Sequence, residues 1–153
     1  MRRRSVVLFA IAVAGILLAL SFSVYWVNRT ATVTGTVDNK AICGTRYDTA
    51  YTLAVMGPDG LSTYLPETSS LFAGMNSSSL VTEELIAHIR GTGFEPYYVC
   101  GIRLTTLDPV NRLYPGQTPG YIIGLDGFNK LSLNQNVTFD VSYNEIWTVH
   151  FVH

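Results

Sequence analysis

The chain divides into one uniformly apolar stretch and a longer region in which apolar and polar residues alternate. Residues 5–27 contain no charged side chain. From residue 30 onward, apolar positions recur at every second residue in several short runs, which is the period of half-buried β-strands. The pattern therefore predicts an N-terminal helix followed by a small, mainly β domain.

The β domain is predicted to contain seven or eight short strands. Gly57-Pro58-Asp59-Gly60 predicts a tight turn and a hairpin, because Pro fixes φ and Gly accepts positive φ. Asn144 and Glu145 predict the turn of a second hairpin at the C-terminus. The runs span residues 30–42, 47–56, 61–65, 97–107, 121–125, 128–133, 137–143 and 147–151. Two architectures fit this pattern: a β-sandwich, or a partly open five-stranded barrel of the OB type with an added C-terminal hairpin.

One helix is predicted within the domain, after a Ser-rich loop at residues 66–79. Val81, Leu85 and Ile89 recur every four residues and form one apolar stripe. Ser79 is the expected N-cap, and Gly91 supplies a C-terminal stop. This helix completes the strand–strand–strand–helix–strand–strand order of the OB-type alternative.

The apolar stretch predicts a membrane anchor. A helix of about 20 residues crosses the hydrocarbon core of a bilayer, and residues 5–27 exceed that length. Three arginines precede it, so residues 1–4 are expected to stay cytoplasmic while residues 28–153 cross the membrane. The alternative is a signal peptide cleaved after Ser23, which would release a secreted domain. Both alternatives place the domain outside the cytoplasm.

The two cysteines, Cys43 and Cys100, are an even number in a domain predicted to be exported. Disulfides persist in such compartments, so a bond between these cysteines is the expectation. The other interpretation is a pair of buried thiols. Two cysteines cannot make a four-ligand zinc site without histidines, and the three histidines lack the necessary spacing.

Three N-x-S/T sequons begin at Asn28, Asn76 and Asn136. They are candidate glycosylation sites if the domain is exported in a cell that modifies asparagine. Asn28 directly follows the apolar stretch, so modification there is the least expected of the three.

Charge and motifs exclude several classes of function. From residue 29 onward the chain has seven basic and eleven acidic residues. A mildly acidic domain does not favour nucleic-acid binding, which needs a basic patch. We find no P-loop, nucleophile elbow, dinucleotide fingerprint or calcium loop, so no cofactor is predicted. His150 and His153 are three residues apart on an expected strand and therefore face opposite sides, which disfavours a shared metal.

The Pro- and Gly-rich segment at residues 108–120 is the main candidate for recognition. Long irregular loops are often functional, and Arg112 and Tyr114 lie within this one. The sequence therefore predicts a membrane-anchored binding module or accessory subunit. Its expected partners are the bilayer, through residues 5–27, and other membrane or cell-surface proteins. An extracytoplasmic enzyme with a site assembled from scattered residues is the competing prediction.

Overall fold

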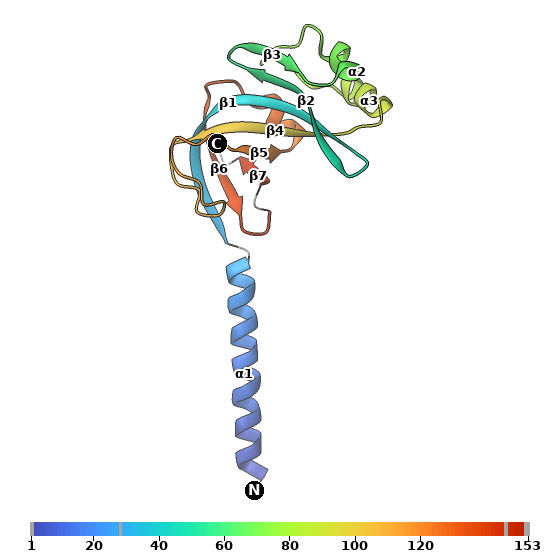
Figure 1. Ribbon diagram of the computed structural model, residues 1–153. Coiled ribbons are helices and arrows are strands. Elements are labelled where there is room, and N and C mark those ends of the chain that lie inside the picture. Colours follow the sequence, from blue (N-terminus) through green and yellow to red (C-terminus); the bar gives the residue numbers. More distant parts are fainter. Residues whose placement is uncertain (1, 28, 146, 152–153) are drawn as a thin grey trace.

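The computed structural model describes the backbone of residues 2–27, 29–145 and 147–151, and the side chains of residues 13–25, 29–145 and 147–149. Helix α1 (Arg2–Val27) projects as a single rod from a β-rich domain (Figure 1). Among the described residues, no helix is both long and apolar enough to span a bilayer. The side chains of residues 5–12, 26 and 27 of the predicted anchor lie outside this description.

The domain is built on one antiparallel sheet of seven strands in the described residues, which confirms the mainly β prediction. Its strand order is β3-β2-β1-β4-β5, with β6 paired to β1 and β7 paired to β6. The strands are β1 (Thr30–Arg46), β2 (Thr49–Gly57), β3 (Gly60–Thr63), β4 (Glu95–Leu104), β5 (Gly120–Ile123), β6 (Asn136–Ser142) and β7 (Val149–Phe151).

The long strand β1 organises the sheet. Its first half pairs with β6, its second half pairs with β2, and β4 pairs with residues 35–45. Since β4 overlaps both halves, β2 and β6 must follow one another along the opposite edge of β1. The sheet curves without closing, and β5 meets the segment before β7 through one isolated bridge, Ile122 to Thr148. The described strands thus form one open sheet, not the two stacked sheets of a sandwich.

A β-bulge in β1 decides which side chains enter the core. Val37 pairs with Ile102 and Lys40 pairs with Cys100, with a register shift between residues 37 and 39. Because Ile102 and Cys100 are two residues apart on one face of β4, Val37 and Lys40 also share that face. All four side chains are buried. Without the bulge, simple alternation along β1 would have placed the Lys40 side chain on the other face of the sheet from Val37.

The predicted hairpins are present. Gly57 pairs with Gly60 across Pro58 and Asp59, and β6 and β7 form the C-terminal pair. The loop at residues 66–79 contains two short helical segments that the pattern did not predict, α2 (Pro66–Ser69) and η1 (Ser70–Phe72).

Helix α3 (Glu83–Gly91) begins later than predicted. Thr82, not Ser79, is the N-cap, and its side chain accepts a hydrogen bond from the Leu85 N–H at 3.3 Å. The Asn129 side chain binds both the N–H and the carbonyl of Val81. The shorter of these bonds is 2.8 Å. Because both backbone groups of Val81 bind Asn129, Val81 stays outside the helix.

The strand predicted at residues 128–133 is wrong. Residues Leu125–Lys130 instead form α4, in which the Phe128 N–H donates to the Gly124 carbonyl. The helical turn buries the Phe128 ring against Tyr98, with 5.2 Å between ring centroids. Burial of this ring in tertiary contact therefore outweighs the turn signal of Asp126-Gly127.

The predicted disulfide is absent, and both thiols are free and buried. On the neighbouring strands β1 and β4, Cys43 lies opposite Tyr97, while Cys100 lies opposite Lys40. An offset of three residues corresponds to about 10 Å along a strand and places the two side chains on opposite faces. A disulfide requires Cβ atoms about 4 Å apart, so this register excludes the bond.

Candidate functional site

The candidate site is the irregular loop at residues 105–119, which joins β4 to β5 and contains both recognition residues proposed from the sequence. Its first residues are bound to β1. The N–H groups of Thr105 and Thr106 donate to the Thr34 carbonyl, and the Thr34 N–H donates to Thr106 Oγ1 at 2.8 Å. The beginning of the loop is therefore part of the hydrogen-bonded sheet.

Asp108 is the polar centre of the loop and is fully buried. Its Oδ1 accepts from the backbone N–H groups of Val110 and Asn111, both at 3.0 Å. Its Oδ2 accepts from Asn111 Nδ2 at 2.8 Å and from the Tyr121 hydroxyl at 2.6 Å. A buried acceptor with four donors is well satisfied, so Asp108 fixes the loop conformation.

The Tyr121 hydroxyl joins the loop to the sheet core. Burial raises the pKa of Tyr121, and its hydrogen bond to Asp108 raises it further. Tyr121 therefore keeps its proton and remains the donor to Asp108. Its ring also lies edge-on to Phe139, with 5.0 Å between centroids. Tyr121 therefore connects Asp108 in the loop to the apolar core of the sheet.

A tight turn forms the second half of the loop. The Gln117 N–H donates to the Tyr114 carbonyl, with Pro115 and Gly116 between them. Gly116 has φ of 91°, as the third position of a type II turn requires. Gln117 Oε1 in turn accepts from the Tyr114 N–H at 2.7 Å. Both the N–H and the carbonyl of Tyr114 are thus hydrogen-bonded to Gln117.

The loop presents an aromatic ring, a guanidinium and an aliphatic side chain to solvent. Tyr114 is 66% exposed and Leu107 is 48% exposed. Arg112 is also exposed and has φ of 58°, in the left-handed region that non-Gly residues rarely adopt. An exposed tyrosine on a preorganised backbone can contribute contact area to a partner at low entropic cost.

The other residues proposed from sequence do not converge on this loop. Asn76 and Asn136 are both exposed, so their glycosylation stays a prediction. Asn76 Oδ1 accepts from the Ser78 N–H, and Asn136 Oδ1 accepts from Thr36 Oγ1. Asn28 lies outside the described residues.

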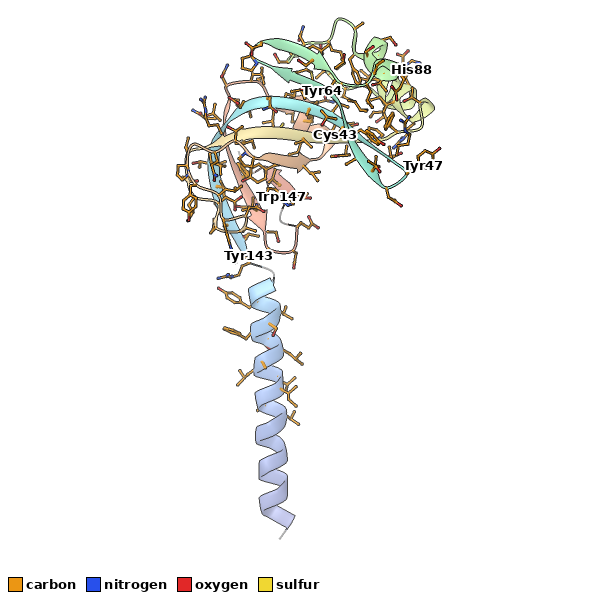
Figure 2. All side chains as sticks on the ribbon, viewed as in Figure 1. Cys43, Tyr47, Tyr64, His88, Tyr143 and Trp147 are labelled. Atoms are coloured by element: carbon orange, nitrogen blue, oxygen red, sulfur yellow. The ribbon has the colours of Figure 1, made fainter. Side chains whose placement is uncertain are left out.

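No metal centre is found within the described part of the chain, where no three His, Cys, Asp or Glu side chains gather. His88 is exposed on α3, at the end of the domain away from α1 (Figure 2). The side chains of His150 and His153 are outside the described residues, so the argument from their spacing is not tested.

Sequence reasoning missed a second buried polar centre at Lys40, which is 1% exposed. Its Nζ donates to the Leu131 carbonyl at 3.0 Å and to the Ser77 carbonyl at 3.4 Å. It also lies 4.5 Å from the centroid of the Phe128 ring. Burial lowers the pKa of Lys40, and the neighbouring Cys100 opposes that shift.

The thiols of the domain are unsuited to nucleophilic chemistry. Burial raises the pKa of Cys100 to about 12. Burial also raises the pKa of Cys43, against a smaller opposing effect of hydrogen bonds with Thr52 and Tyr97. A thiol must ionise to attack a substrate, so both groups are structural at neutral pH.

Comparison with known proteins identifies no relative: no family model, curated protein or solved structure matches the chain. A function must therefore be argued from the sequence and from the geometry of the domain.

Proposed function

We propose that this protein is a membrane-anchored, extracytoplasmic binding module or accessory subunit, held by residues 5–27 and contacting a partner protein through the 105–119 loop. The proposal combines an anchor argued from hydrophobicity with a recognition surface argued from loop geometry. A cleaved, secreted form of the same domain is the alternative for the N-terminal segment.

The exposure of α1 is the observation that carries the anchor. Every described side chain from Val13 to Tyr25 is exposed. Large apolar side chains occupy consecutive as well as spaced positions of this helix, so the helix has no polar face. Six of them are 58–72% exposed: Ile16, Leu17, Leu18, Leu20, Phe22 and Val24. Apolar surface of this extent is unfavourable in water by roughly 25 cal/mol per Å². Lipid or another protein must cover it.

The domain supports a separate role because it does not use α1 for its own core. Its buried apolar residues come from the strands, from the helical segments and from the connections between them, and none comes from the described part of α1. Cutting or replacing α1 is therefore expected to change where the domain is held without changing how it packs.

The anchor is tested by extracting membranes of an expressing cell with alkaline carbonate. We expect the full-length chain to stay in the membrane fraction, with the domain digested by protease added from the non-cytoplasmic side. Mass spectrometry of the purified chain reports whether cleavage after Ser23 has occurred. Full-length chain in the carbonate supernatant would contradict the anchor.

The recognition loop is tested by native electrophoresis of membranes solubilised in mild detergent. We expect the wild-type chain to migrate in a complex, and Tyr114→Ala combined with Arg112→Ala to shift it to the isolated form. Tyr64→Ala is the matched control, because Tyr64 is 60% exposed and lies outside the loop. An equal shift for Tyr64→Ala, or none for the loop variant, would contradict this role of the loop.

A further inference from the structure

The junction between α1 and β1 is too short to separate the domain from the end of the helix. Helix α1 ends at Val27 and β1 begins at Thr30, so two residues connect them. Arg29 follows Val27 by two residues, so its Cα atom lies at most about 7 Å from that of Val27. The headgroup layer on each side of a bilayer is also about 5–7 Å thick. If α1 is inserted, the first residues of the domain must lie at the level of the lipid headgroups.

Arg29, the residue before β1, is bound to the residue that follows β6. The Tyr143 N–H donates to the Arg29 carbonyl at 3.2 Å, and Thr30 pairs with Ser142. The Arg29 guanidinium carbon lies 4.7 Å from the centroid of the Tyr143 ring. Arg29 is therefore bound to the sheet through both its backbone and its side chain.

The side chains gathered here have the chemistry of a membrane interface. Tyr143 is 37% exposed and Tyr25, one helical turn before the junction, is 68% exposed. Tyrosine rings prefer the boundary between hydrocarbon and water, and arginine binds phosphate oxygens with a planar fork of donors. Figure 2 shows Tyr143 beside the end of α1, with Tyr47, Tyr64 and His88 on more distant parts of the domain.

From this juxtaposition we infer that Arg29 and Tyr143 form a lipid-headgroup contact that seats the domain on the bilayer. The ligand is the phosphate group of a phospholipid, with the Tyr143 ring against the glycerol region. The inference rests on the proposed anchoring. It adds a fixed orientation, in which the surface carrying Tyr47 and Tyr64 is presented away from the membrane.

Site-specific photocrosslinking of the full-length chain tests this contact. The chain is reconstituted into phosphatidylcholine nanodiscs with benzoylphenylalanine at position 143, at position 64 as the distal control, or at position 25 as the control within the helix. We expect a mass increase of one phospholipid at positions 25 and 143 and none at position 64. We also expect Arg29→Gln to lower the yield at position 143 several-fold while leaving the yield at position 25 unchanged.

The controls separate the two ways in which the idea can fail. Lipid adducts at position 25 without any at position 143 would overturn the headgroup contact and leave the anchor intact. The absence of adducts at both positions, together with failure to incorporate into nanodiscs, would overturn the anchor itself. Unchanged tryptophan fluorescence of each variant establishes that the domain is folded.

Discussion

The two buried polar centres of the domain satisfy their hydrogen-bonding groups in opposite ways. Asp108 is an acceptor surrounded by four donors, three of them from Val110 and Asn111 in its own loop. Lys40 is a donor that reaches carbonyls 37 and 91 residues away in sequence. The first arrangement holds one loop in shape, whereas the second connects distant segments around the sheet.

The difference has an energetic consequence. Removing Asp108 leaves one buried and three part-buried donors without their acceptor, and each loss costs a desolvation penalty that grows with burial. Removing Lys40 leaves carbonyl oxygens, which have two lone pairs and tolerate incomplete bonding better than N–H groups do. We therefore expect a large effect at the loop and a small one at Lys40. The following experiments use the full-length chain in neutral detergent, with urea unfolding followed by tryptophan fluorescence.

Asp108→Ala is expected to have the largest effect, a loss of about 3–5 kcal/mol of unfolding free energy, since it deletes the acceptor of four hydrogen bonds. Asp108→Asn, which retains one acceptor oxygen, should lose less. If the alanine variant lost under about 1 kcal/mol, the view of Asp108 as the centre of the loop would be wrong.

Measuring the unfolding free energy at alkaline pH tests the burial of Cys100, the neighbour of Lys40. Burial raises the pKa of this thiol from 9.0 to about 12. An acid with a raised folded-state pKa holds its proton more tightly when folded, so its contribution to stability is complete below pH 9 and is lost between pH 9 and 12.

Between about pH 7.5 and 10.5, the wild type should lose about 2 kcal/mol more than Cys100→Val, at 1.36 kcal/mol for each pKa unit. The buried Lys40, whose pKa is lowered, acts in the opposite direction, because stability then rises with pH until the unfolded lysine also loses its proton. Comparing the two chains at each pH removes the part of the Lys40 contribution that does not depend on Cys100. Parallel pH profiles would contradict the burial of the thiol.

Tyr121→Phe is expected to cost about 1–2 kcal/mol, because it removes one hydrogen bond to a carboxyl group and preserves the buried ring. The loss should be smaller than that of Asp108→Ala, since three donors remain on Asp108. A double-mutant cycle with Asp108→Ala measures the coupling. Additive effects would show that the hydroxyl and the carboxyl group do not stabilise each other.

Lys40→Met should have the smallest effect, less than about 1 kcal/mol at neutral pH. The variant keeps an unbranched chain of similar volume and removes the cost of burying an amine, which offsets the lost carbonyl hydrogen bonds. Lys40→Ala, which leaves a cavity, should lose about 2–4 kcal/mol and is the matched control. If Lys40→Met were as damaging as Asp108→Ala, the contrast between the two centres would not hold.

Local signals in the sequence were sufficient for the parts of the fold that depend on neighbouring residues. Pro58 and Asp59 between two glycines predicted a hairpin, and the Pro- and Gly-rich segment predicted an irregular loop containing Tyr114. Both are present. Turn chemistry and two-residue alternation act within a few residues, so they can be read without knowledge of the fold.

The residues that organise the candidate loop could not be predicted in this way. Asp108 lay at the boundary of a predicted loop, and nothing in the sequence marks Tyr121 as its partner thirteen residues later. Similarly, the α-helical turn at Phe128 depends on contacts of its ring with Tyr98 of β4 and with Lys40, which a turn signal at Asp126-Gly127 cannot report.

The sequence by itself determined that residues 5–27 carry no charged side chain, and that the following region alternates as strands do. Only the tertiary structure decided which polar groups enter the core and which cysteines could meet. The reason is register: one bulge near Asp38 turns Lys40 inward, and a three-residue offset between β1 and β4 keeps Cys43 and Cys100 on opposite faces. Such offsets depend on how strands pair across the whole sheet, and no short segment of sequence encodes them.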